Sequence, residues 1–305
     1  MRFSACVERQ GSSPFARCWL RGLIAQSPEL DVLAENLAAR LTGATVAAAR
    51  LVSVAALKTV DPPLDALVGR VVTGAGRRAK YVWLELDGLY LTLHLSLGGR
   101  ITLGPKPAAR KVAVLTLDLG ERGVLSVTEA GSQRRAAVWL VEDLAKVSNL
   151  AGLGPEPLDP GFTVERLRGL LAEGGHSLKG MLTDQKVMAG VGNAWSDDVL
   201  HRARLSPFAR PDRLDPEEIA RLHAALGGVL TAARGALAEQ VAGEVLIPRA
   251  AARHFAVHGR AGAACFACGD TIRSVWLGER ETSYCPTCQT GGRVLADRRR
   301  SRFLR

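Results

Sequence analysis

Residues 265–288 read CFACGDTIRSVWLGERETSYCPTC and hold two Cys-x-x-Cys pairs, Cys265 with Cys268 and Cys285 with Cys288, separated by sixteen residues. Four thiolates at this spacing are typical of a zinc ribbon, in which the ion is tetrahedral and every ligand comes from the protein. The alternatives are four unpaired cysteines or two disulfides. We predict one structural Zn²⁺, whose binding would release roughly 10–16 kcal/mol and fold a module that lacks a core. Because no coordination position is left for substrate, any catalysis must lie elsewhere.

The composition indicates a multidomain protein with a polyanionic partner. The chain has 305 residues, of which 47% are hydrophobic, enough for two or three domains. Forty Lys and Arg residues face thirty Asp and Glu residues, which gives a formal net charge of +10. This balance favours nucleic acid over a membrane as the partner, and a generally Arg-rich proteome is the alternative explanation. No uncharged run of about eighteen apolar residues is present, so no membrane span is predicted.

The other cysteines and the N-terminal residues indicate a cytoplasmic protein. Only Cys6 and Cys18 lie outside the two pairs, so no disulfide framework is implied and a reducing compartment fits. Residues 1–23 contain four arginines but no apolar core of signal-peptide length, which argues against secretion. We expect these residues to form a disordered N-terminal extension.

A helix and a series of short strands are predicted next. Residues 27–43 carry four leucines on one face at helical spacing, and Gly43 ends this helix. Turn pairs such as Asp87-Gly88 and Gly98-Gly99 separate the strands, as a sandwich or barrel of antiparallel strands requires. The predicted strands cover residues 46–54, 71–73, 81–86, 90–95, 112–117, 124–127 and 137–141.

The second half of the chain has helical patterns. Thr163 can cap a helix that runs to the glycines at 174 and 175. Asp215 provides another cap, Pro216 a proline at the first helical position, and an amphipathic stripe follows. The residues at 154–161 are rich in proline and glycine, which is typical of a linker between the two halves.

Two glycines stand before a polar residue at the start of another helix. Gly190, Gly192 and Asn193 would expose backbone N–H groups at the helix N-terminus, which suits a phosphate. A glycine-rich connector between helices explains the same residues equally well. Lys179, one helical segment upstream, adds a positive charge and favours the phosphate.

Six segments together resemble the Fpg/Nei family of DNA glycosylases (formamidopyrimidine-DNA glycosylase and endonuclease VIII). Residues 186–198 (KVMAGVGNAWSDD) resemble its helix–two-turn–helix element. The remaining matches occur in the family's order and are RRAKY at 77–81, HLSLGG at 94–99, LGPEPL at 153–158, VHGRAG at 257–262 and YCPTCQ at 284–289. Residues 128–135 and 289–292 resemble a branch common in actinobacteria.

The resemblance implies the fold class and the domains. The expected class is multidomain α+β: an N-terminal antiparallel β-sandwich with a leading helix, a helical helix–two-turn–helix domain and a C-terminal zinc ribbon. The expected ranges are 1–23 for the extension, 24–150 for the sandwich, 151–162 for the linker, 163–256 for the helical domain and 257–305 for the zinc finger with a basic tail.

The resemblance also implies roles for individual residues. Lys80 would contact the phosphate beside the lesion, Asn193 would hold a phosphate, and Arg280 would bind the phosphates of the flipped nucleotide. Cationic and amide donors are what phosphate oxygens require. Leu97 would intercalate as an aliphatic wedge. Lys179 and Arg260 complete the predicted DNA-binding set.

The implied partner is double-stranded DNA with damaged or abasic sites. We expect a monomer that does not bind membranes, located in the cytoplasm and associated with the nucleoid. Members of the family flip the damaged base out of the duplex. The amine of an N-terminal proline attacks the anomeric carbon, and the adjacent glutamate acts as general acid–base.

The catalytic N-terminus departs from the family pattern Met-Pro-Glu-Leu-Pro-Glu-Val-Glu. The best match places Pro28-Glu29 on the second Pro-Glu pair and keeps the helix at full length. It puts Ala25 at the nucleophilic proline and Gln26 at the glutamate, where an amide cannot exchange a proton. The other alignment puts Pro28-Glu29 on the catalytic pair but deletes nearly a turn of helix. In both, the required amine is a peptide nitrogen.

Three explanations are open: an incorrect start, cleavage after Ile24 that leaves Ala25 as a primary amine, or loss of glycosylase activity. The sequence therefore supports two functions. One is a glycosylase and abasic-site lyase acting on oxidised bases in base excision repair. The other is a catalytically silent paralogue that only binds damaged or abasic DNA. An RNA-binding zinc ribbon explains only the cysteines and the charge. If the intact chain is active, Lys80 is the nearest candidate amine.

Overall fold

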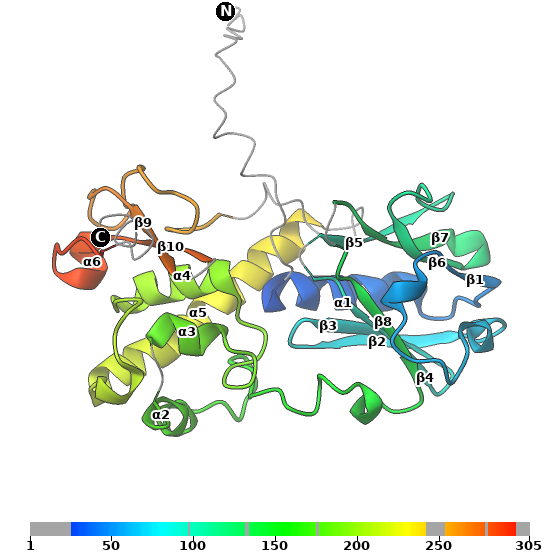
Figure 1. Ribbon diagram of the computed structural model, residues 1–305, viewed down its shortest axis with the longest axis horizontal. Helices are drawn as coiled ribbons and strands as arrows, with labels where there is room; N and C mark the ends of the chain where they lie inside the picture. The colour runs from blue at the N-terminus through cyan, green and yellow to red at the C-terminus, as the bar shows by residue number, and fades with distance from the viewer. Residues whose placement is uncertain are drawn as a thin grey trace, which may run out of the picture.

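The computed structural model describes residues 26–96, 98–131, 134–174, 177–241, 254–277 and 280–296. A β-sandwich occupies one end of the long axis, and a helical domain with a small two-stranded finger occupies the other (Figure 1). Helix α1 lies between them. This arrangement agrees with the predicted fold class.

Helix α1 (Ser27–Leu41) begins with a proline in its first turn, and the carboxylate of Glu29 accepts a hydrogen bond of 3.0 Å from the Gln26 N–H. Its four core leucines are at most 1% exposed, and burial of one leucine contributes roughly 1.5–3 kcal/mol. Val32 faces the other way and packs in the helical domain. The helix ends at Leu41, after which Gly43 adopts a φ of +85°, a left-handed conformation that glycine favours.

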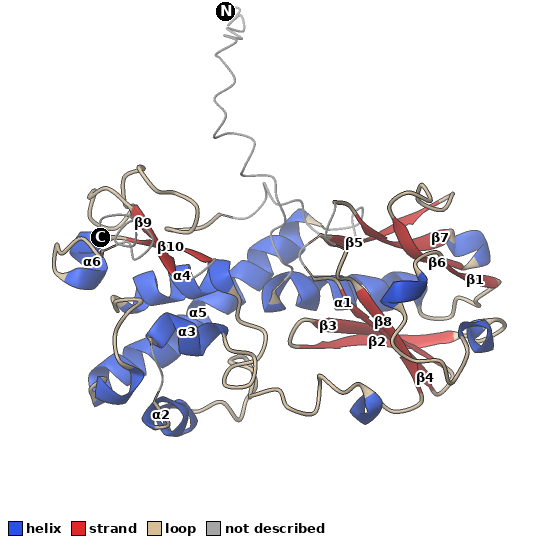
Figure 2. Ribbon diagram, viewed as in Figure 1, coloured by secondary structure: helices blue, strands red, loops and turns tan. Residues whose placement is uncertain are grey.

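Two four-stranded antiparallel sheets form the sandwich (Figure 2). Their facing side chains share one core with α1. The first sheet has the order β1 (Ala48–Leu51), β6 (Ala113–Asp118), β7 (Val124–Glu129) and β5 (Gly99–Gly104). The second has the order β2 (Val72–Arg78), β3 (Tyr81–Leu86), β4 (Leu89–His94) and β8 (Ala137–Val141).

Three details of the strand prediction were wrong. The predicted strand 71–73 was too short, because β2 continues to Arg78 in antiparallel pairing with β3. The predicted strand 46–54 is shorter, because the N–H groups of Val52 and Ser53 both donate to the Val114 carbonyl and the chain then turns. Strand β5 was not predicted, because the glycine pair at its start indicated only a turn. Gly99 is required there, since an added Cβ would lie 2.3 Å from the Leu95 carbonyl oxygen.

The helical domain consists of helices that pack around one apolar core. The predicted caps are confirmed: Thr163 Oγ1 accepts from the Arg166 N–H at 3.2 Å, and Asp215 and Glu218 form a reciprocal capping box. The helices are α2 (Val164–Ala172), α3 (Leu178–Thr183), α4 (Asn193–Ala203) and α5 (Pro216–Gln240).

The finger has little apolar core of its own. Its apolar cluster consists of Val257 and Ile272 packed with Cys265, Cys285 and the partly buried Cys288. Its elements are β9 (Arg273–Leu277), β10 (Arg280–Tyr284) and α6 (Pro286–Thr290). Short 3₁₀ turns elsewhere in the chain are η2 (Val54–Ala56), η3 (Leu64–Leu67), η4 (Gly120–Arg122), η5 (Leu144–Lys146) and η6 (Pro211–Arg213). None of the described helices has the length and apolar character needed to cross a membrane.

Candidate functional site

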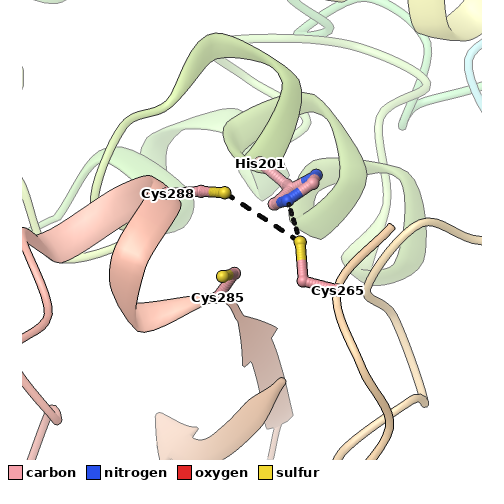
Figure 3. Close-up of side chains that lie close together, drawn as sticks. All are labelled: His201, Cys265, Cys285 and Cys288. Atoms are coloured by element: carbon pink, nitrogen blue, oxygen red, sulfur yellow. Dashed lines mark hydrogen bonds between the residues drawn. The ribbon is translucent and has the colours of Figure 1, made fainter. Parts of the chain in front are cut away.

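Three cysteines of the finger, Cys265, Cys285 and Cys288, surround one point together with His201 of α4 (Figure 3). Among the residues that the structure describes, four side chains place their ligand atoms within 4.8 Å of one another: His201, Cys265, Cys285 and Cys288. Cys268 belongs to the same group, because its Sγ lies 3.4 Å from that of Cys285. All four cysteines are free, so the disulfide alternative does not hold.

The donor set fits a soft divalent cation. Burial raises the pKa of Cys285 to about 11 and also raises the pKa of Cys288. At neutral pH these thiols need a nearby cation in order to ionise. Tetrahedral zinc takes thiolate or imidazole ligands, and the module has little else to hold it together. The structure therefore supports a metal centre at the predicted cysteines.

Polar side chains on one face of α4 attach the finger to the helical domain. Asn193 and Asp197 are four residues apart and therefore lie above one another on this face. Asn193 Nδ2 donates to the carbonyl of Glu281 at 2.9 Å, and Asp197 Oδ2 accepts from the Ser283 N–H at 3.1 Å. Both partners belong to β10, so α4 fixes the position of that strand.

Asp198 anchors the loop that leads into the finger. Its carboxylate accepts backbone hydrogen bonds from Ala256, Val257 and His258 at 2.6, 3.0 and 3.1 Å. Burial raises the pKa of Asp198, and these three donors offset the shift only in part. His258 Nδ1 in turn lies 2.7 Å from Asp197 Oδ2, which closes a network between the loop and α4.

Lys179 has its partners inside the protein. Its side chain is 2% exposed, and its Nζ forms an ion pair with Asp197. The ammonium group also donates to the Glu281 carbonyl at 3.5 Å. These contacts support the attachment of the finger, and the DNA contact expected of Lys179 stays a prediction. Removal of one partner from such a pair typically costs about 3–5 kcal/mol.

Arg260 braces the finger loop. Its guanidinium donates to the carbonyls of Ala256 and Ala264. It also lies 3.6 Å from the ring centroid of Phe266, a cation–π arrangement. This internal role was not predicted. The DNA contact expected of Arg260 stays a prediction.

The start of α1 meets the start of α4, and Gly190 and Gly192 permit this close approach. An added Cβ on Gly192 would lie 2.5 Å from the Gln26 side chain, and one on Gly190 would lie 1.8 Å from Ser27 Oγ. The Ser27 N–H donates to the Gly190 carbonyl at 3.1 Å. These glycines therefore serve packing, as the connector interpretation proposed.

Gln26 is buried at this junction and lies at the N-terminus of α4. It is 2% exposed, and its Oε1 accepts from the Trp195 N–H at 3.4 Å. Glu29 accepts from Trp195 Nε1 at 3.2 Å and joins the same two helices. A helix N-terminus favours negative charge, yet position 26 carries a neutral amide. Ala25 lies outside the described residues, as do Leu97 and the extension 1–23.

Lys80 and Arg280 come from opposite domains, and the charge of Arg280 acts on Lys80. Burial, and then the positive charge of Arg280, lower the pKa of Lys80 to about 8. Burial and Lys80 likewise lower the pKa of His94 on β4. Arg280, exposed at the start of β10, donates to Thr183 Oγ1 at 3.1 Å. Asn193 forms a hydrogen bond with Glu281, the neighbour of Arg280. The three predicted phosphate ligands therefore lie where the sandwich, α4 and the finger adjoin.

A buried carboxylate fixes the turn that carries Lys80. Glu156 Oε1 accepts from the Ala79 N–H at 2.6 Å, and Ala79 has a φ of +53°. Arg77 bridges Glu156 to Asp31 of α1. The 151–162 segment therefore packs against the sandwich, and it determines where Lys80 lies.

This geometry defines a class of protein: a β-sandwich joined to a helical domain and a finger whose cysteines could bind a metal, with the predicted phosphate-binding residues at their junction. The family model described as formamidopyrimidine-DNA glycosylase N-terminal domain matches residues 25–136, and the H2TH domain model of the same family matches residues 153–241. The chain belongs to the formamidopyrimidine-DNA glycosylase family.

Individual relatives agree with this membership. The formamidopyrimidine-DNA glycosylase of Roseiflexus sp. is 34% identical over 86% of this chain and 98% of its own length. A formamidopyrimidine-DNA glycosylase-like protein of Mycobacterium tuberculosis is 44% identical over 50% of this chain and 94% of its own, consistent with an actinobacterial branch. The structure of Lactococcus lactis Fpg in complex with DNA containing an abasic site covers 87% of this chain and 99% of its own, with a TM-score of 0.79 and 25% identity.

Proposed function

We propose that this protein binds duplex DNA at a damaged or abasic nucleotide and acts in base excision repair, as a member of the DNA glycosylase family. The observation that carries the proposal is the convergence of Lys80, Asn193 and Arg280 from three separate elements. A cationic lysine, an amide and a guanidinium suit consecutive phosphates of a strand. The net charge of +10 would add long-range attraction.

The metal in this proposal is Zn²⁺, held by Cys265, Cys268, Cys285 and Cys288. Its role is structural, because it would hold the hairpin that presents Arg280. Leu97 would fill the space left by the flipped nucleotide. A cytoplasmic, nucleoid-associated location and a monomeric state remain predictions that accompany a DNA partner.

A second candidate is DNA binding without base excision, which the environment of Gln26 favours. The reaction needs an unblocked amine and a carboxylic acid that moves protons. In the 305-residue chain the nitrogen of Ala25 is a peptide nitrogen, and Gln26 cannot ionise. Processing that exposed the Ala25 amine would restore only the first requirement.

Binding and excision are tested with the same DNA. We expect fluorescence anisotropy to show tighter binding to a duplex with a tetrahydrofuran abasic analogue than to the undamaged duplex. The logarithm of the affinity should fall with the logarithm of salt concentration by about 0.9 per neutralised phosphate. Equal affinity for both duplexes, or no salt dependence, would contradict the binding proposal. Borohydride trapping on a true abasic site then distinguishes the two candidates.

A further inference from the structure

The metal centre has five donors for four coordination positions. Four are the predicted cysteines, and the fifth is His201, which belongs to α4 and not to the finger. Its Nε2 lies 3.2 Å from Cys265 Sγ. Figure 3 shows its ring turned toward the space enclosed by Cys265, Cys285 and Cys288. His201 is 9% exposed, so protein surrounds it.

The spacing of these donors is close to that of ligands on one ion. Tetrahedral coordination with Zn–S bonds of about 2.3 Å places two sulfurs roughly 3.8 Å apart. The Cys265 and Cys288 sulfurs lie 3.9 Å apart, and the Cys268 and Cys285 sulfurs lie 3.4 Å apart. Since His201 lies within 4.8 Å of three of these sulfurs, an ion bound among them is within reach of the imidazole after a small shift.

The five donors differ in exposure. Cys265 and Cys285 are buried and Cys288 is intermediate, whereas Cys268 is exposed. Cys268 is therefore the ligand most open to solvent and to thiol reagents. The histidine lies on the buried side, held by the same face of α4 that binds β10.

We propose that His201 is a reserve metal ligand that completes a Cys3His site with Cys265, Cys285 and Cys288 when Cys268 does not bind. This inference rests on the proposed Zn²⁺. With all four cysteines bound, His201 donates a hydrogen bond from Nε2 to the Cys265 thiolate. When Cys268 is lost, the imidazole proton moves to Nδ1 and Nε2 binds the ion. Cys3His is an established ligand set for structural zinc.

Zinc stoichiometry of four purified full-length variants tests this proposal. The variants are Cys268→Ala, His201→Ala, the double variant, and Cys285→Ala as the control that removes a cysteine common to both ligand sets. Alanine adds no oxygen donor that could take the vacant position. After dialysis against a moderate chelator, we expect about one zinc per chain in the parent and in both Cys268→Ala and His201→Ala. The double variant and Cys285→Ala should retain almost none.

Cobalt substitution checks the ligand type directly. Co²⁺ bound to Cys268→Ala should show weaker thiolate-to-cobalt charge transfer than the parent, because one sulfur is replaced by nitrogen. Zinc loss from Cys268→Ala, retention in the double variant, or loss from His201→Ala alone would each overturn the reserve role. A parent protein without zinc would instead contradict the proposed metal, and because no DNA is present, neither result depends on DNA binding.

Discussion

Helix α4 serves two junctions, and they differ in how far they keep the chemistry of the family. Along its face toward the finger, Asn193 and Asp197 hold β10, and Asp198 holds the loop that leads into the finger. At its N-terminus α4 packs closely against α1, and there Gln26 occupies the position that the best match to the family pattern gives to a carboxylic acid. The difference teaches that the contacts which hold the finger do not require a carboxylic acid at position 26.

Loss of the metal should have the largest effect and remove the first junction. Cys285→Ser, or strong chelation, should unfold the finger, because structural zinc supplies roughly 10–16 kcal/mol of folding free energy. Affinity for abasic duplex should fall at least about a hundredfold, since Arg280 loses its support and each charged contact is worth about 1.5–3 kcal/mol. Zinc analysis with anisotropy measures both. The sandwich should keep its thermal unfolding transition after the metal is lost. Loss of that transition together with the metal would show that the sandwich does not fold independently of the finger.

A carboxylic acid restored at position 26 tests the second junction, between α1 and α4. In a chain that begins at Ala25, Gln26→Glu should raise lyase activity about 10²-fold or more, the typical contribution of general acid–base catalysis. The α4 N-terminus would stabilise the new carboxylate. Rates of strand cleavage and borohydride trapping measure the change.

The matched control is Gln26→Glu in the full-length chain, where the Ala25 nitrogen stays a peptide nitrogen. We expect it to bind abasic duplex and to cleave little. If the unmodified 305-residue protein already excises oxidised bases at a high rate, the binding-only candidate is wrong. Loss of trapping in Lys80→Ala would then identify Lys80 as the amine.

Sequence patterns predicted the fold where local chemistry decides it. The helix from residue 27, the caps at Thr163 and Asp215, and most strands are set by residues near in sequence. Strand β5 was missed because glycine pairs indicate turns, whereas here Gly99 permits close approach to Leu95. No local signal distinguishes these two uses of glycine.

The site was predictable only as far as its residue types. The burial of Lys179 depends on Asp197, eighteen residues away, and on contact with β10. The nearness of His201 to Cys265 spans sixty-four residues. One signal was available: His201 follows Asp197 by four residues, so both lie on one helical face. Without the position of the finger, that face had no assigned partner.

Removal of Arg280 should have a smaller effect than loss of the finger. Arg280→Ala should weaken binding of all DNA sequences alike by about tenfold to a hundredfold, because a charge-assisted contact is worth about 1.5–3 kcal/mol. The salt dependence should flatten by about one unit. Titrations at several salt concentrations provide both values. Arg50→Ala, on the edge strand β1, makes the same charge change away from the junction and should leave the slope nearly unchanged.

The smallest expected effect is a dependence on pH that comes from Lys80. Burial and Arg280 lower its pKa to about 8, so the free protein carries this charge below pH 8 and loses it above. A bound phosphate favours the charged form and raises the pKa, so DNA binding must take up a proton at high pH. Affinity should therefore fall about tenfold between pH 7 and pH 9 by proton linkage.

Lys80→Arg supplies the control, because a guanidinium stays charged across this range. Its affinity should change less than that of the parent between pH 7 and pH 9, and the difference between the two proteins isolates Lys80 from other titrating groups. Identical pH profiles would show that Lys80 does not bind phosphate. DNA binding would then rest on α4 and the finger without a contribution from Lys80.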